Sequence, residues 1–236
     1  MPPCIDASLY WLDEDAEFSF TRVCQHLLAR GMTTADAIVA SRGASFITAS
    51  QGRPKEQRSK THAPPGRLGV HYSPISEEAG AHGDHPAIEL SWEDAYALNP
   101  AVSPNRLPPW NIRDYRFFTD LCAQLSPLYA NLTGEDWVSC AYDMLHGKHY
   151  GRFATFFCQD ALLGADAAAF WATYPYIEQV GGGTYGTEYR PWSGRKWTAG
   201  RGMVAVARSS QVTREAQFLA ALKRAYRSYR TKGQFG

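Results

Sequence analysis

The pattern of apolar and polar positions predicts a mixture of strands and helices along the whole chain. Short apolar or alternating runs, which are typical of strands, occur at residues 4–12, 37–49 (one or two strands, divided at Gly43), 69–72, 87–92, 152–158, 184–192 and 203–208. Apolar residues at helical spacing predict helices over 13–30, 114–125, 165–174 and 213–229, and a strand and a helix are expected within 129–142. Because these elements do not alternate regularly, the pattern indicates an α+β fold with a mixed or mainly antiparallel sheet packed by helices.

Length and composition favour one domain over residues 1–236. The chain is 44% hydrophobic and 13% aromatic, so it can bury a sizeable core. Residues 51–69 are polar and basic and contain Pro54, Pro64 and Pro65, which predicts a mobile loop there.

The ends of the chain and its cysteines predict a cytoplasmic protein. Residues 1–15 carry acidic side chains and no basic n-region, so a secretory signal is not expected, and no apolar run approaches the length needed to cross a membrane. The 5 cysteines are odd in number, widely spaced and without a C-x-x-C pair. Buried free thiols in a reducing compartment explain them best.

A net charge of +1 conceals a separation of charge along the chain. Residues 71–100 contain six acids and no lysine or arginine: Glu77, Glu78, Asp84, Glu89, Glu93 and Asp94. The last helix instead carries a basic stripe: Lys223, Arg224, Arg227, Arg230 and Lys232. An acidic surface suits a basic partner such as a nuclease. The basic stripe indicates either an ordinary solvated helix face or a surface for an acidic partner or nucleic acid.

The groups that could carry chemistry do not form a specific motif. Two His-x-x-His pairs, His82/His85 and His146/His149, could hold zinc, but they lie in predicted loops and lack the glutamate of a His-Glu-x-x-His motif. Residues 181–184 (Gly-Gly-Gly-Thr) lack the ending of a phosphate-binding loop and are better explained as a hairpin turn. We therefore expect no catalytic residue, no metal and no cofactor.

Residues 184–197 combine aromatic, basic and glycine residues in a way that is frequent at recognition surfaces. A structural hairpin whose tryptophans enter the core would have the same composition. The candidate partner-binding residues in this stretch are Tyr185, Tyr189, Arg190 and Trp192, which join the six acids.

Four stretches in order resemble the immunity proteins of bacterial polymorphic-toxin and type VI secretion systems, and most nearly the immunity protein 52 family. These stretches are residues 115–130 (Tyr-Arg-Phe-Phe to Pro-Leu-Tyr-Ala), residues 152–157 (Arg-Phe-Ala-Thr-Phe-Phe), residues 182–185 (Gly-Gly-Thr-Tyr) and residues 202–206 (Gly-Met-Val-Ala-Val). The resemblance implies an α+β protein without activity of its own that binds and neutralises a cognate toxin, commonly a nuclease. It supplies no catalytic residues and leaves the oligomeric state open.

The sequence leaves two other classes of function open. One is a metal-dependent hydrolase assembled from scattered histidines and carboxylates, and the other is a nucleic-acid-binding module that uses the basic C-terminal third. Toxin binding that occludes the toxin's active site remains the leading interpretation, with no membrane and no direct nucleic-acid contact expected.

Overall fold

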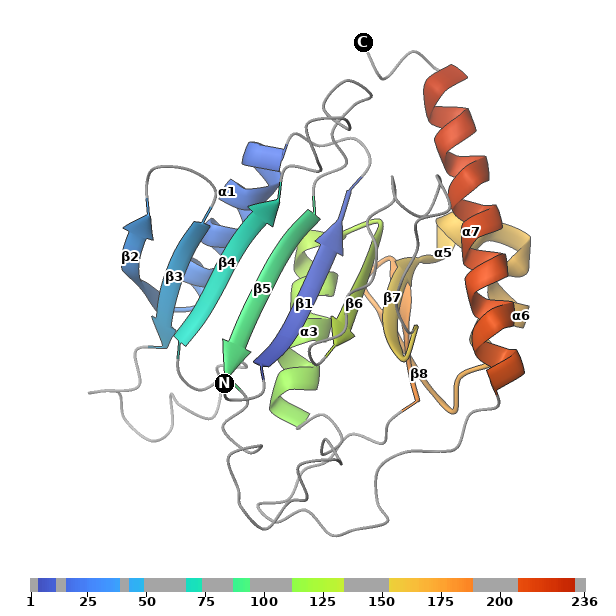
Figure 1. Cartoon of the computed structure of the whole chain (residues 1–236), viewed down its shortest axis with the longest axis horizontal. Coiled ribbons are helices and arrows are strands. Elements are labelled where there is room, and N and C mark those ends of the chain that lie inside the picture. Colours follow the sequence, from blue (N-terminus) through green and yellow to red (C-terminus); the bar gives the residue numbers. More distant parts are fainter. Residues whose placement is uncertain are drawn as a thin grey trace, which may run out of the picture.

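A computed structural model describes residues 4–11, 16–38, 43–48, 67–73, 87–93, 112–133, 153–188 and 208–231 (Figure 1). Its strands are β1 (Cys4–Tyr10), β2 (Met32–Ile38), β3 (Gly43–Thr48), β4 (Arg67–Ser73), β5 (Ala87–Glu93), β6 (Tyr129–Thr133), β7 (Thr155–Gln159), β8 (Tyr176–Val180) and β9 (Gly183–Thr187). Its helices are α1 (Ala16–Ala29), α3 (Ile112–Leu125), α5 (Asp160–Leu163), a 3-10 turn (Gly164–Asp166), α6 (Ala167–Trp171) and α7 (Arg208–Thr231). The architecture confirms the predicted α+β class.

All nine described strands form one sheet in the order β2-β3-β4-β5-β1-β6-β7-β9-β8. Every pairing between neighbours is antiparallel. The first strand of the chain lies in the middle, where β5 and β6 flank it. Residues from opposite ends of the sequence therefore meet across the sheet.

One face of the sheet is covered by α1 and α3, which Figure 1 shows behind the strands. Alternate strand residues such as Leu9, Val70 and Leu90 are fully buried there against Val23 of α1 and Phe118 of α3. The spacing of apolar residues in both helices accounts for this contact, because it places them on a single stripe.

The opposite face carries a second core beneath α5, α6 and α7. Tyr10, Tyr129 and Phe156 lie on this face of β1, β6 and β7 and pack with Phe170 of α6 and Phe218 of α7. Leu9 belongs to the first core and Tyr10 to the second, so the central strand contributes to both layers. This alternation is the expected signature of a strand buried on both sides.

Several predicted boundaries are corrected by the structure. The helix predicted over 165–174 is shorter in the structure: it comprises the end of the 3-10 turn (Gly164–Asp166) and α6, which ends at Trp171. The last helix begins at Arg208 rather than at Thr213, which removes the end of the strand predicted over 203–208. Residues 32–36 of β2 were not predicted as a strand, because Met-Thr-Thr-Ala-Asp-Ala-Ile does not alternate cleanly between apolar and polar residues.

Candidate functional site

The second face of β1, β4 and β5 is polar, in contrast to the apolar face beneath α1. Strand alternation places the neighbours of the buried residues Ala7, Val70 and Leu90 on this face. We call it the polar sheet face, and the register assigns to it the backbone positions of Asp6, Ser8, Arg67, His71, Ser73, Glu89, Ser91 and Glu93. These positions comprise three acidic residues and one arginine, so the formal charge of the polar sheet face is negative when His71 is neutral.

The register joins this face into a continuous polar row across four strands. His71 of β4 pairs with Glu89 of β5, Glu89 pairs with Ser8 of β1, and Ser8 pairs with Asn131 of β6. Asp6 follows one step along β1 and pairs with Ser91.

Asn131 marks the boundary between the polar row and the second core. Its side chain is fully buried, and neither amide atom has a hydrogen-bond partner among the described residues. Ser8 beside it is 9% exposed, whereas Asp6 is half-buried. The polar row therefore runs from the half-buried Asp6 to the fully buried Asn131. A buried amide without hydrogen-bond partners lowers the stability of the fold.

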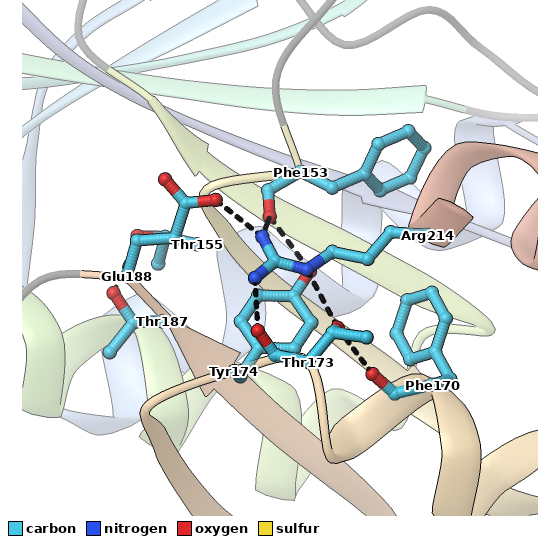
Figure 2. Close-up of polar contacts among 8 residues, drawn as sticks. All are labelled: Phe153, Thr155, Phe170, Thr173, Tyr174, Thr187, Glu188 and Arg214. Atoms are coloured by element: carbon cyan, nitrogen blue, oxygen red, sulfur yellow. Dashed lines mark hydrogen bonds and ion pairs between the residues drawn. The ribbon is translucent and has the colours of Figure 1, made fainter. Parts of the chain in front are cut away.

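The most deeply buried charge in the described part of the chain is Arg214 of α7 (Figure 2). Its Nε donates to Thr173 Oγ1 at 2.8 Å, and its Nη1 donates to the Phe153 carbonyl at 3.2 Å and also to Glu188 Oε1. The guanidinium lies 3.7 Å from the centroid of the Tyr174 ring, and the Tyr174 hydroxyl donates to the same Phe153 carbonyl at 2.7 Å. Arg214 and Glu188 are 0% and 2% exposed.

The Arg214 centre joins four segments that are distant in sequence. It binds α7 to the residues after α6, to the start of β7 and to the end of β9. Burial raises the pKa of Tyr174 far above its usual range, so this hydroxyl stays protonated as a donor. With the guanidinium committed to these partners, the centre acts as an anchor that holds α7 on the sheet.

The described cysteines have the properties of core residues and not of nucleophiles. Burial raises the pKa of the Cys24 thiol to about 11, and it raises the pKa of Cys122 and Cys158 well above the usual value. The protonated thiol is a poor nucleophile, and no opposite charge offsets the burial. The prediction of buried free thiols is therefore confirmed for Cys122 and Cys158, whereas Cys24 is free and partly buried.

A smaller polar cluster connects α3 to β8. Tyr115 donates its hydroxyl to Glu178 Oε2 at 2.6 Å, and Arg116 Nη1 donates to Glu178 Oε1 at 3.1 Å. Burial, followed by the bond to Glu178, raises the pKa of Tyr115. The Arg116–Glu178 pair is half-exposed, so its role is to orient β8 and not to store much stability.

Two of the predicted partner-binding acids are brought together on one surface. Glu89 and Glu93 occupy alternate positions on the polar sheet face of β5, where Ser8 and Cys4 are their partners in β1. Asp6 lies between these partners, and the sequence analysis missed it although it alternates with Ile5 and Ala7 in the first strand. The remaining predicted residues, Glu77, Glu78, Asp84, Asp94, Tyr189, Arg190 and Trp192, lie outside the described residues.

Tyr185 is corrected from a surface residue to a core residue. Its side chain is 1% exposed and packs edge-on against Tyr115, with ring centroids 4.7 Å apart. It faces α3 because Glu178 and Tyr185 are paired on the first face of the sheet. The stretch 184–197 therefore begins in the core, as expected if it forms a structural hairpin and not a recognition surface.

The other predicted motifs divide between those that can be placed and those that cannot. Gly181 and Gly182 form the turn between β8 and β9, which confirms the hairpin interpretation. Both His-x-x-His pairs lie outside the described residues, and no cluster of three or more metal-ligating side chains occurs within the described ones. None of the described helices is long and apolar enough to span a membrane.

Comparison with known proteins yields a weak likeness to a solved structure. No protein-family model matches the chain, and no curated protein matches it. Among solved structures, it is similar to the Pseudomonas aeruginosa T6SS protein PA0821, with 11% sequence identity and a TM-score of 0.40 over 94% of this chain and 72% of that one. A TM-score below 0.5 supports no argument about shared fold or function.

Proposed function

We propose that this protein is an immunity protein that binds a cognate secreted toxin through the polar sheet face and blocks the toxin's active site. The observation that supports the proposal is the gathering of Asp6, Glu89 and Glu93 on one sheet face by the register of β1 and β5. Figure 1 shows α5, α6 and α7 on the β7 side of the sheet, away from β4 and β5. The sequence resemblance to immunity proteins implies the same role.

The charge of this face favours a basic partner. Three carboxylates on adjacent strands attract a cationic surface such as the substrate groove of a nuclease. Complementary charge of this kind speeds the encounter and selects the partner, while apolar contacts supply much of the affinity.

The first experiment is to capture the partner with the tagged protein from its native host under conditions that express secretion machinery. We expect a stoichiometric basic protein whose toxicity is suppressed by co-expression of this chain. Recovery of no stoichiometric partner, or of a partner without toxicity, contradicts the proposal.

The second experiment measures association kinetics with the recovered partner for three neutralised variants, Asp6→Asn, Glu89→Gln and Glu93→Gln. Each is expected to slow association several-fold at low salt, with a smaller effect at high salt because salt screens exposed charges. The matched control is Asp166→Asn, which removes an exposed carboxylate that pairs only with the exposed Arg224 among the contacts described. Equal rates for the control and the three face variants would place the binding surface elsewhere.

A further inference from the structure

The strand β8 forms one edge of the sheet as described. It pairs with β9 in an uninterrupted antiparallel register from Tyr176–Thr187 to Val180–Gly183, and no described strand lies on its other side. Edge strands present unpaired backbone groups to solvent, and many natural sheets protect them. The exposure of β8 therefore raises the question of what it binds.

The hairpin geometry identifies which backbone groups face outward. In a two-residue hairpin the pair that closes the turn is hydrogen-bonded, and bonded pairs then alternate along the strands. Val180, Glu178 and Tyr176 are consequently the positions bonded to β9. The N–H and C=O groups of Ile177 and Gln179 point to the open side, ready to pair with another strand.

The two edges of the described sheet differ in their protection. At the opposite edge, the register of β2 shifts between Thr34 and Asp36, and the skipped position is Ala35. A bulge of this kind is one of the devices that hinder edge pairing. No such irregularity occurs in β8, and its Ile177 is 58% exposed.

The side chains of β8 suit an added strand with a defined pattern. Ile177 lies on the face that carries the second core, where its neighbour in β9 is Gly186. Glu178 lies on the opposite face and is held by Tyr115 and Arg116. An added strand would place an apolar side chain beside Ile177 and a basic or hydroxyl side chain beside Glu178.

A second copy of this chain fits the edge poorly. The two-fold antiparallel pairing with the greatest overlap is centred on Glu178 and sets this carboxylate opposite its own copy, which is unfavourable. A shift of register relieves the repulsion but shortens a strand that has only five residues. We therefore propose that the outer edge of β8 binds an extended segment of a different protein by strand addition, with an apolar residue beside Ile177 and Lys, Arg or Thr beside Glu178.

This surface is separate from the polar sheet face and does not depend on the proposed function. Between β1 and β8 lie β6, β7 and β9, which at the usual strand spacing is roughly 19 Å. A partner could occupy both surfaces, but each can be tested alone.

The test uses a phage-displayed library of random dodecapeptides selected on the immobilised full-length protein. We expect enriched peptides with alternating apolar positions, a basic or hydroxyl residue between them and no central proline. Ile177→Pro removes an outward N–H without removing a bond to β9, and it should weaken the enriched peptides about tenfold, the change expected for one lost backbone hydrogen bond. Ile177→Lys keeps the ladder intact and should weaken them as well, because a lysine is a natural edge-protecting residue.

The matched control is Leu28→Lys, which makes the same change at a side chain of α1 that is 46% exposed. It should leave peptide affinity unchanged, and thermal melting of all three variants verifies that they are folded. The proposal is overturned if no peptide is enriched, or if Leu28→Lys weakens binding as much as Ile177→Lys. A dimer in sedimentation velocity that both Ile177 variants abolish would overturn it in favour of self-association.

Discussion

At the scale of single residues, the Arg214–Glu188 ion pair is the most deeply buried of the ion pairs given for the described residues. Both side chains are withdrawn from water, so each loses several kcal/mol of hydration that only excellent geometry can offset. The carbonyl of Phe153, the hydroxyl of Thr173 and the ring of Tyr174 supply the additional contacts. The pair therefore fixes the position of α7 on the sheet more than it adds to the free energy of unfolding.

Arg214→Met should destabilise the protein by about 3–5 kcal/mol in urea unfolding, because it leaves Glu188 buried and unpaired. The double variant Arg214→Met/Glu188→Gln should recover a substantial part of this loss, since no uncompensated charge remains. The control is Arg224→Met, which breaks an exposed ion pair with Asp166 and should cost less than about 1 kcal/mol. A double variant no more stable than Arg214→Met would show that the damage comes from lost packing and not from the stranded carboxylate.

The sequence contained a signal for this residue that the apolar pattern alone did not reveal. Arg214 stands four residues before Phe218 and eight before Leu222, so it continues the buried stripe of the last helix. A charged residue at a core position predicts a buried partner. The partner itself, Glu188, could not be predicted, because it comes from a strand end 26 residues away in the chain.

At the scale of elements, the β8–β9 hairpin depends on the conformation of one glycine. Gly181 has a φ of 59° at the first central position of the turn, as a type II′ turn requires. A Cβ atom at this position would also lie 3.2 Å from the Ala123 backbone of α3. The turn thus matches the twist of the strands and lets α3 approach closely.

Gly181→Ala should lower the free energy of unfolding by about 1–2 kcal/mol, because alanine is strained at this φ. Gly182→Ala is the matched control: its added Cβ would meet no atom within 4 Å, and its φ lies outside the left-handed region. It should be neutral or slightly stabilising. Thermal unfolding compares the two, and an equal loss for both would refute the special role of Gly181.

Local pattern predicted the elements well where one face is clearly apolar. The alternation of Ile5, Ala7 and Leu9 revealed β1, and the stripe of Tyr115, Phe118 and Leu121 revealed α3. The order of the strands could not be predicted, because β1 pairs with β5 and β6, which lie far along the chain. The polar sheet face depends on that pairing, so its acids on β5 were predicted as partner-binding residues but their neighbours on β1 were not.

At the scale of the whole molecule, one sheet separates two aromatic cores. In the first, Phe118 of α3 packs against Tyr185 of β9, and in the second, Phe218 of α7 packs against Phe156 of β7. Because β1 contributes Leu9 to one core and Tyr10 to the other, neither layer can lose its packing without disturbing the central strand. Both proposed binding surfaces lie on this shared sheet, which supports them from both sides.

The shared strand predicts that the two cores unfold as one cooperative unit. Phe118→Ala and Phe218→Ala are matched changes, since both side chains are fully buried and lie on opposite faces of the sheet. Each should reduce the free energy of unfolding by about 3–5 kcal/mol. In native-state hydrogen exchange, each substitution should lower the protection of slow amides in α3 and in α7 by the same amount, because these amides exchange only through global unfolding. If Phe218→Ala lowered protection in α7 alone, the layer of α5 to α7 would open independently, and the polar sheet face would be supported by the first core only.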